Sequence, residues 1–194
     1  MAGFHFFAML SRMKYISRWG LMRNTKTENI SEHSHEVCYI AHALALIAKN
    51  RLNKDVNIEK CLALALYHDA GEILTGDMPT PIKYYNPEIK DAYKKVEAVA
   101  ANKLVSMLPS YMKDDLTPLL CEQDDTSHEA SLVKAADKIS ALIHCIEEEK
   151  AGNKEFSKAK TAIYNTVTSL SMPEVDIFIS DFLESYYLTL DEQD

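Results

Sequence analysis

The stretch Cys61–Asp77, with the sequence CLALALYHDAGEILTGD, decides the fold, because an apolar run ends there abruptly at His68-Asp69. The alternation of leucine and alanine also fits a strand, but these two residue types are among the best helix formers. We therefore expect one fully buried helix over residues 58–73. On such a helix Glu72 follows His68 by four residues and Asp69 by three, so the three side chains would share one side.

The composition predicts an all-α protein with a single domain over residues 1–194. The chain has 194 residues, of which 47% are hydrophobic and 26% charged, enough for one substantial core but too few for two comfortable domains. It has only five glycines and six prolines, and its apolar spacing is helical almost throughout. Glycine-rich phosphate loops are absent, so phosphate chemistry would require a metal, side chains or helix N-termini.

The net charge restricts the possible binding partners of the protein, and the cysteines indicate its cellular compartment. A net charge of −8 opposes binding to long nucleic acid and to an anionic membrane, although a small anionic substrate remains compatible with a locally positive site. The four cysteines have no CxxC spacing and lie in apolar helical contexts, which is typical of reduced, buried thiols. Because no stretch reaches membrane-spanning length and no signal peptide is evident, we expect a cytoplasmic protein.

Capping and periodicity predict the other helices. Asn29 and Glu32 form a capping box that opens a helix over residues 30–50. The apolar stripe of this helix consists of Val37, Ile40, Ala41, Leu44, Ile47 and Ala48, and the stripe of the helix at 129–149 consists of Leu132, Ala136, Ile139, Ile143 and Ile146. Further helices are expected at residues 4–16, 86–108 (with Ile89, Tyr93, Val96, Ala100, Leu104 and Leu108 inward), 156–170 and 175–190. Residues 74–81 are expected to form a loop, and residues 122–125 a solvated acidic loop.

Several candidate site residues have a plain structural interpretation when each is considered by itself. His33 falls in the apolar stripe of its helix and is either a hydrogen-bonded core residue or a ligand. Asp137 lies at the margin of a stripe and either pairs with a neighbouring lysine or binds a ligand. Arg18 can be a solvated charge and Trp19 a core aromatic, and Asp77 can be an ordinary turn residue.

Considered together, four of the candidates form a ligand set. His33, the doublet His68-Asp69 and Asp137 supply two imidazoles and two carboxylates from three separate helices. Four mixed nitrogen and oxygen ligands suit one divalent transition metal ion, namely manganese, cobalt, iron, nickel or zinc. The absence of thiolates opposes a structural zinc site, and open coordination positions would remain for water and substrate.

The order of these ligands resembles that of the HD-domain superfamily of metal-dependent phosphohydrolases. More closely, three strings are similar to the YfbR-type bacterial 5'-deoxynucleotidases: SRWGLMRNTKTENISEHSHEV at 17–37, YHDAGEILTGDMPTPIKY at 67–84 and VKAADKISAL at 133–142. The similarity extends over essentially the whole chain. It implies an HD-domain helical bundle with one metal site at its centre. It also implies a homodimer that removes phosphate from deoxyribonucleoside 5'-monophosphates.

The same resemblance implies a role for each matching residue. His33, His68, Asp69 and Asp137 would bind one metal ion, and Glu72 would serve acid/base chemistry. Arg18 would orient the phosphate as a catalytic and substrate-binding residue, and Trp19 would approach the sugar. The remaining implied substrate contacts are His33, Asp137, Asp77, Met78, Pro79 and Thr80.

Two other functions remain open on the sequence. One is a different HD reaction, either hydrolysis of a deoxynucleoside triphosphate to release triphosphate or cleavage of a phosphodiester. The other is a noncatalytic helical dimerisation module that retains a structural metal. The single visible ligand set opposes the first function, and Glu72 beside an open site opposes the second, because a structural site has no use for an additional acid.

Overall fold

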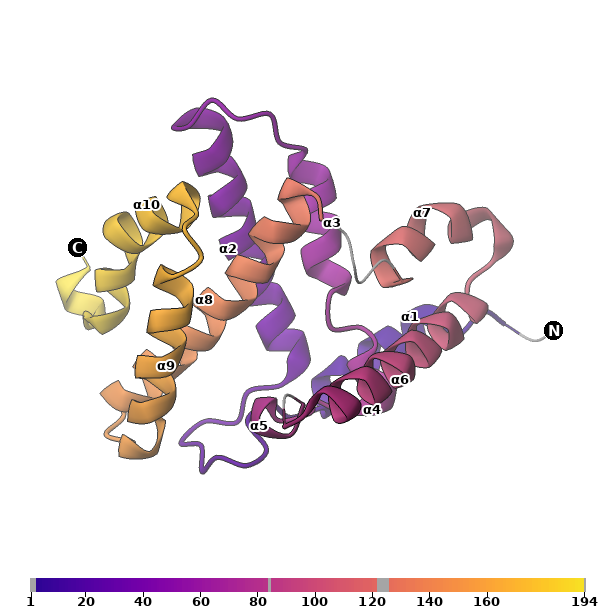
Figure 1. Cartoon of the computed structure of the whole chain (residues 1–194), viewed down its shortest axis with the longest axis horizontal. Coiled ribbons are helices and arrows are strands. Elements are labelled where there is room, and N and C mark those ends of the chain that lie inside the picture. Colours follow the sequence, from indigo (N-terminus) through magenta and orange to yellow (C-terminus); the bar gives the residue numbers. More distant parts are fainter. Residues whose placement is uncertain (1–2, 84, 122–125, 194) are drawn as a thin grey trace. The chain divides into compact units, whose positions relative to one another are not determined.

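The computed structural model describes residues 3–83, 85–121 and 126–193, and these residues are predominantly helical (Figure 1). No strand occurs within these ranges, where Ser17 and Asn29 form an isolated antiparallel β-bridge. The prediction of an all-α protein is therefore confirmed. The predicted acidic loop at 122–125 lies outside the described residues. In the part of the chain that the structure covers, no helix combines the length and apolarity needed to cross a membrane.

Ten α-helices and four 3₁₀ segments are present in the described residues. They are α1 Phe6–Leu10, η1 Ser11–Tyr15, α2 Ile30–Asn50, α3 Ile58–Tyr67, α4 Glu72–Thr75, α5 Thr80–Lys83, α6 Pro87–Ser106, α7 Ser110–Cys121, α8 His128–Lys150, η2 Lys154–Phe156, α9 Ser157–Thr168, α10 Pro173–Phe182, η3 Leu183–Tyr187 and η4 Leu190–Glu192. They belong to two compact units. Unit 1 holds residues 3–21, 27–34, 66–83 and 85–121, and unit 2 holds residues 22–26, 35–65 and 126–193.

The start of α2 confirms the predicted capping box. Asn29 Oδ1 accepts hydrogen bonds from the backbone N–H groups of Ser31 (3.0 Å) and Glu32 (3.1 Å), and Glu32 Oε2 accepts one from Asn29 N–H (3.3 Å). These bonds satisfy N–H groups that have no partner within the helix. The side chain of Asn86 caps α6 in the same way, by accepting from Ile89 N–H at 2.8 Å. Local sequence signals therefore set where both helices begin.

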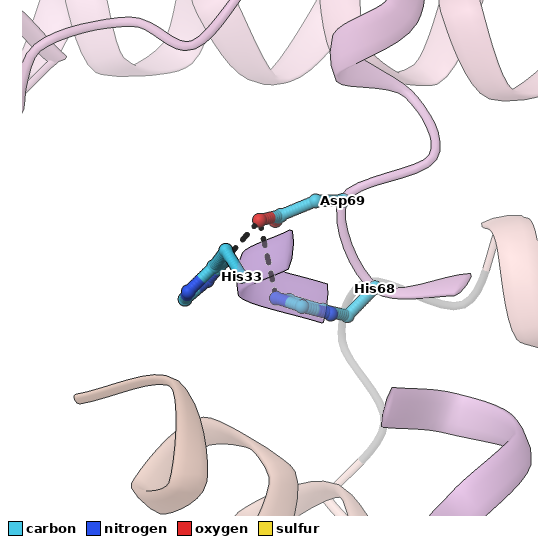
Figure 2. A group of neighbouring side chains, drawn as sticks. All are labelled: His33, His68 and Asp69. Carbon is cyan, nitrogen blue, oxygen red and sulfur yellow. Dashed lines mark ion pairs between the residues drawn. The ribbon is translucent and has the colours of Figure 1, made fainter. Parts of the chain in front are cut away.

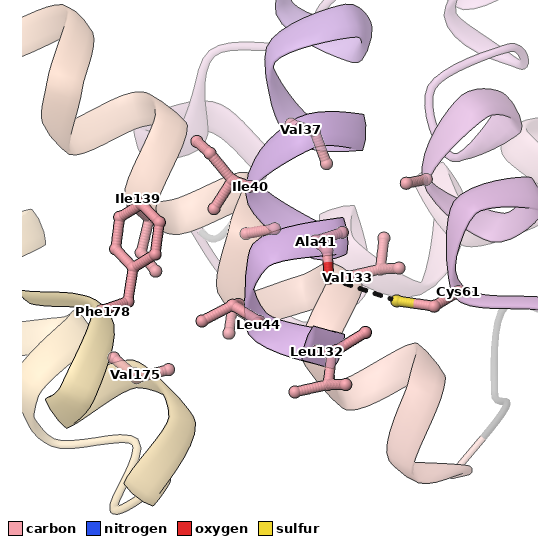
Figure 3. Close-up of a cluster of buried hydrophobic side chains, with 14 of the residues drawn as sticks. Val37, Ile40, Ala41, Leu44, Cys61, Leu132, Val133, Ile139, Val175 and Phe178 are labelled. Atoms are coloured by element: carbon pink, nitrogen blue, oxygen red, sulfur yellow. Dashed lines mark hydrogen bonds between the residues drawn. The ribbon is translucent and has the colours of Figure 1, made fainter. Parts of the chain in front are cut away.

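The core of unit 2 is built from α2, α3, α8 and α10, with Val167 of α9 also buried in it (Figure 3). The predicted stripes of α2 and α8 are both buried. Labelled members of this core in Figure 3 are Val37, Ile40, Ala41, Leu44, Cys61, Leu132, Val133, Ile139, Val175 and Phe178. The Cys61 thiol lies 3.7 Å from the carbonyl oxygen of Ala41 and donates to it. Cys61 and Cys145 are buried, as their apolar contexts predict, whereas Cys38 and Cys121 are only partly buried, so the prediction of four buried thiols is wrong for these two.

Unit 1 has a smaller core, which gathers side chains from short elements. Phe6 of α1 packs in a cluster with Leu104 and Leu108, near the end of α6, and with residues of α7. Ala70, from the turn that follows α3, is fully buried in the same cluster. Helices α4 and α5 contact α6. The turn that carries His68-Asp69 is therefore anchored by an apolar side chain next to it.

The predicted helix over 58–73 is wrong in its C-terminal part. Helix α3 ends at Tyr67, residues 68–71 form a turn, and α4 starts at Glu72. The N–H of Ala70 bonds to Tyr67 O at 3.0 Å and the N–H of Glu72 bonds to Asp69 O at 3.0 Å, so the backbone tightens to i→i−3 bonds. Helix α3 is also not fully buried, because Leu66 is 48% exposed.

Three further predictions need correction. The predicted loop at 74–81 includes the end of α4 and the start of α5. Val96 of α6 is exposed rather than inward. The segments at 4–16 and 175–190 each begin as an α-helix and continue as 3₁₀ turns. Apolar spacing does not distinguish these two helix types, which differ by less than one residue per turn.

A buried carboxylate fixes the segment 22–26 of unit 2. Glu148 of α8 is 2% exposed. Its carboxylate accepts hydrogen bonds from the N–H groups of Thr25 (3.0 Å) and Lys26 (3.2 Å) and from Asn153 Nδ2 (2.7 Å). Burial raises the pKa of Glu148, but these hydrogen bonds outweigh burial and hold the pKa below its ordinary value.

Replacing Glu148 with glutamine should therefore destabilise the protein at pH 7 by about 2 kcal/mol, the scale of hydrogen bonds to a charged group. The pKa is lower in the folded state, so this stabilisation is present above the ordinary glutamate pKa of about 4.3 and is lost as the pH falls through the folded pKa. Urea unfolding of both proteins at several pH values measures the difference. The exposed neighbour Glu147→Gln serves as control, and a difference that does not depend on pH would contradict the assignment.

Candidate metal and substrate site

Three of the four predicted metal ligands lie together in unit 1 (Figure 2). The ligand atoms of His33, His68 and Asp69 are all within 4.8 Å of one another. Asp69 Oδ2 lies between the imidazoles, 3.1 Å from His68 Nε2 and 3.5 Å from His33 Nε2. His33 is fully buried, so its imidazole is removed from solvent.

Two local features bring these side chains together. His33 occupies the first turn of α2, where its N–H bonds to the carbonyl of Asn29 at 3.1 Å. His68 and Asp69 follow directly on the end of α3, and the tight turn directs both side chains toward His33 (Figure 2). The first turn of α2 and the turn after α3 therefore carry the three candidate ligands.

The donor set fits a divalent transition metal. Two atoms that bind one Zn²⁺ at about 2.1 Å each lie no more than about 4.2 Å apart. Both distances from Asp69 Oδ2 fall within that limit, at 3.1 and 3.5 Å. Imidazole nitrogen and carboxylate oxygen are suitable ligands for zinc and its neighbours in the first transition row.

The fourth predicted ligand, Asp137, belongs to unit 2. It lies on α8 between the buried residues Ala136 and Ile139 of the apolar stripe, and it is half-buried. The margin position expected from the sequence is thus observed. Its role as a ligand stays a prediction.

Glu72 lies close to the three candidate ligands in the chain and has a strongly raised pKa. Burial, followed by the negative charges of Asp69 and Asp77, raises the pKa of Glu72 to about 9, although Arg18 and Lys83 act in the opposite direction. The side-chain atom Oε2 is buried and has no hydrogen-bond partner among the described residues. Burial and the two neighbouring carboxylates therefore favour the protonated form of Glu72.

Arg18 and Trp19 form one assembly with Glu28. Arg18 Nη1 donates to Glu28 Oε2 at 2.5 Å, and Trp19 Nε1 donates to the same oxygen at 3.1 Å. The Arg18 guanidinium carbon lies 5.7 Å from the centre of the Trp19 ring, within cation–π range. The sequence did not single out Glu28, because an isolated glutamate outside any periodic segment carries no recognisable signal.

Trp19 has an unusual backbone conformation. Its φ of 59° lies in the left-handed region, which costs a bulky residue about 1–2 kcal/mol. The Trp19 N–H donates to the carboxylate of Asp77. Burial raises the pKa of Asp77, while Arg18 and this hydrogen bond lower it. Trp19 is thus held in this conformation by a hydrogen bond from its indole to Glu28 and a hydrogen bond from its backbone to Asp77.

The predicted substrate loop at 77–80 lies between α4 and α5. Gly76 ends α4 with a φ of 73°, a conformation that a side chain would disfavour. The hydroxyl group of Tyr93 lies 3.3 Å from both the carbonyl oxygen of Gly76 and Thr75 Oγ1, which ties the start of the loop to α6. Asp77, Met78 and Pro79 follow without regular structure, and Thr80 begins α5. Within this loop, Asp77 contacts Trp19 through the backbone bond described above.

The fold matches that of solved HD-domain phosphohydrolases. A Listeria innocua HD-domain phosphohydrolase has a TM-score of 0.85 and 24% sequence identity, covering 99% of this chain and 93% of that chain. A cyanophage S-2L HD phosphohydrolase, solved bound to dA and one catalytic Zn²⁺ ion, has a TM-score of 0.65 and 20% identity over 94% of this chain and 96% of that chain. The architecture is therefore that of the HD-domain phosphohydrolases.

Sequence similarity identifies the family within this class. The family model for YfbR-like 5'-deoxynucleotidases matches residues 5–186. A 5'-deoxynucleotidase of Vibrio vulnificus is 50% identical over 188 residues, which cover 97% of each chain. The chain belongs to the YfbR-like 5'-deoxynucleotidase family, and the resemblance seen in the sequence is confirmed.

The raised pKa of Glu72 predicts a pH-dependent difference between Glu72→Gln and the parent in chelator-treated protein. The folded pKa lies above the unfolded one, so the favourable contribution of the protonated side chain is complete below about pH 4.3 and is lost as the pH rises toward about 9. Glutamine stays neutral throughout. The Tm of Glu72→Gln should therefore exceed the parental Tm increasingly between pH 5 and pH 9, as measured by differential scanning fluorimetry. A constant difference would contradict the assignment.

Proposed function

We propose that this protein is a metal-dependent phosphomonoesterase that hydrolyses deoxyribonucleoside 5'-monophosphates to deoxyribonucleosides and phosphate. The observation that carries the proposal is the convergence of His33, His68 and Asp69, with a protonated Glu72 and the cation Arg18 in the same unit. Membership of the YfbR-like family supports the same reaction, because the Vibrio vulnificus relative is named a 5'-deoxynucleotidase.

The metal would be one divalent transition ion, held by His33, His68 and Asp69 with Asp137 as the fourth ligand. Such an ion polarises a phosphate oxygen and lowers the pKa of a water toward neutrality. The Zn²⁺ ion of the cyanophage enzyme supports this class of metal. We propose zinc, cobalt, manganese, iron or nickel as candidates, because the nitrogen and oxygen donors suit each of them.

Glu72 would act as the proton donor to the departing 5'-oxygen. Its raised pKa keeps the proton on the carboxyl group at neutral pH, and a general acid is most effective with a pKa near the working pH. Asp69 and Asp77 both disfavour ionisation of Glu72, so the residues around the proton donor help to keep it protonated. This arrangement assigns different roles to neighbouring carboxyl groups.

Arg18 and the loop at 77–80 would bind the substrate. A guanidinium matches the geometry of phosphate oxygens and stabilises the negative charge that spreads over them in the transition state. Asp77, Met78, Pro79 and Thr80 would line the nucleotide. The bond from Trp19 N–H to Asp77 supports the grouping of this loop with the Arg18-Trp19 pair. His33 and Asp137 would also lie close enough to contact substrate.

Trp19 would provide the preference for deoxyribose. An indole face packed against C2' of the sugar leaves no hydrogen-bond partner for a ribose 2'-hydroxyl. A buried hydroxyl without a partner costs free energy, so ribonucleotides would bind and react less well. The ring is held at Nε1 by Glu28 and its backbone by Asp77, which supports a fixed orientation.

The remaining properties that we propose concern the whole protein. We propose a single HD domain over residues 1–194 that forms a homodimer in the cytoplasm. Exposed apolar side chains such as Val96 and Val99 on α6 are compatible with a subunit contact. We propose that its partners are small molecules and that it binds neither long nucleic acid nor membranes. The net charge of −8 supports this, because both of those partners are negatively charged.

Comparison of products separates this proposal from the two alternatives. A triphosphohydrolase would release triphosphate from dATP and leave dAMP intact, and a phosphodiesterase would leave both intact. A noncatalytic module would bind metal in stoichiometric amount and hydrolyse none of them. Release of inorganic phosphate from dAMP favours the monoesterase.

Loss of Asp69 should abolish the reaction. Asp69 Oδ2 lies between both imidazoles, so Asp69→Ala should lower both metal content and the rate of phosphate release from dAMP, the latter by at least about 100-fold. The assay uses chelator-treated protein to which manganese, cobalt, zinc or magnesium is returned separately. Asp114→Asn, an exposed carboxylate on α7, is the control. Parental activity in Asp69→Ala would refute the proposed function.

Loss of the Trp19 indole should weaken the preference for deoxyribose over ribose. Trp19→Ala is expected to lower the ratio of kcat/KM for dAMP over AMP by about 10-fold to 100-fold, because the apolar surface facing C2' is removed. Steady-state kinetics with both nucleotides measure the ratio. Undiminished discrimination against AMP in this variant would remove Trp19 from the explanation.

A further inference from the structure

Glu28 links the two side chains that the proposed function assigns to substrate. One carboxylate oxygen, Oε2, accepts from Arg18 Nη1 at 2.5 Å and from Trp19 Nε1 at 3.1 Å. The side chains of Arg18 and Glu28 are each 12% exposed, so solvent screens this ion pair only weakly. A shared acceptor fixes the guanidinium and the indole relative to each other.

The backbone places Glu28 opposite Arg18 independently of the side-chain bonds. Arg18 N–H donates to the carbonyl of Glu28 at 2.9 Å, and Ile30 N–H donates to the carbonyl of Ile16 at 3.0 Å. Ser17 and Asn29 form the β-bridge between these bonds. The segment that precedes α2 is therefore paired with the segment that carries Arg18 and Trp19.

This pairing connects the substrate residues to a metal ligand. Glu28 lies directly before Asn29, whose side chain caps α2, and His33 occupies the first turn of that helix. Movement of the Arg18-Trp19 segment relative to His33 would break the β-bridge, the shared acceptor and the backbone bonds together. Glu28 takes part in both sets of bonds: its carboxylate accepts from the side chains of Arg18 and Trp19, and its carbonyl accepts from Arg18 N–H.

We propose that Glu28 is a positioning residue that holds Arg18 for the phosphate and Trp19 for the sugar, and so sets both turnover and deoxyribose preference. The proposal rests on the proposed function of the site. A guanidinium has five N–H donors in a fixed fork, so a bond from Nη1 to Glu28 is compatible with further bonds to a phosphate. In this proposal Glu28 acts through Arg18 and Trp19.

The variants Glu28→Gln and Glu28→Ala separate the effect of Glu28 on turnover, through Arg18, from its effect on deoxyribose preference, through Trp19. The amide oxygen of Glu28→Gln can still accept from the neutral indole N–H but lacks the charge that strengthens the bond to Arg18. Glu28→Gln should therefore lower kcat for dAMP at least 10-fold while the dAMP over AMP preference stays within about 2-fold of the parent. Glu28→Ala should lower kcat and also reduce the preference toward that of Trp19→Ala.

A double variant tests whether Glu28 acts through Arg18. If it does, Arg18→Ala combined with Glu28→Ala should hydrolyse dAMP no more slowly than Arg18→Ala alone, because residues that act as a unit are non-additive. Additive losses would overturn the positioning role. Glu32→Gln, an exposed capping residue in the same segment, controls for loss of stability at the start of α2.

Fluorescence tests the contact without any hydrolysis. Trp19 is the only tryptophan of the chain, so the emission spectrum reports its environment alone. The emission maximum should shift in Glu28→Ala and remain parental in Glu32→Gln. Failure of the parent to release phosphate from dAMP would refute the proposed function. By contrast, an active parent whose Glu28→Ala variant keeps the parental kinetics, sugar preference and emission would overturn the role of Glu28.

Discussion

The placement of one carboxylate between two imidazoles is the constraint on which the rest of the site depends. Asp69 Oδ2 lies 3.1 Å from His68 Nε2 and 3.5 Å from His33 Nε2, and His33 is fully buried. A carboxylate in such surroundings is stable only where cationic or metal partners compensate for the water it has lost. The chain brings this carboxylate to the imidazoles by ending α3 at Tyr67, so that His68 and Asp69 lie in a tight turn that Ala70 anchors in the core.

The negative charge gathered near this turn contributes to the raised pKa of Glu72. Asp69 and Asp77 both raise the pKa of Glu72, and burial adds to their effect, so Glu72 keeps its proton. The cation Arg18 offsets part of this effect, although the pKa of Glu72 and the pKa of Asp77 both stay above their ordinary values. The same cation is paired with Glu28, and its position is therefore tied to the segment that starts α2. Arg18 is thus subject both to the electrostatics of the site and to the backbone pairing with the segment before α2.

The long helices and the short elements of this molecule have different roles. Long helices supply stability: α2 and α8 bury their apolar stripes in the core of unit 2. Short elements supply much of the candidate chemistry, because His68, Asp69, Glu72 and the 77–80 loop lie in turns or in one-turn helices of unit 1, whereas His33 lies in the first turn of α2. Their backbone conformations are not available to residues in the middle of a long helix, and they bring side chains from different segments together.

The sequence by itself determined the all-α class, the capped start and the end of α2, the stripe of α8 and the candidate ligands His33, His68 and Asp69. These features follow from local signals, because a capping box and a helical period involve residues that are only a few positions apart. Only the tertiary structure decided where α3 ends, how Trp19 adopts a positive φ and which side chains Glu28 contacts. Each of these depends on contacts between segments that are distant in the chain or irregular in conformation: Ala70 with the α6 and α7 cluster, Trp19 with Asp77, and Glu28 with Arg18 across a β-bridge. No periodic pattern records such contacts, since they arise only when the segments pack together.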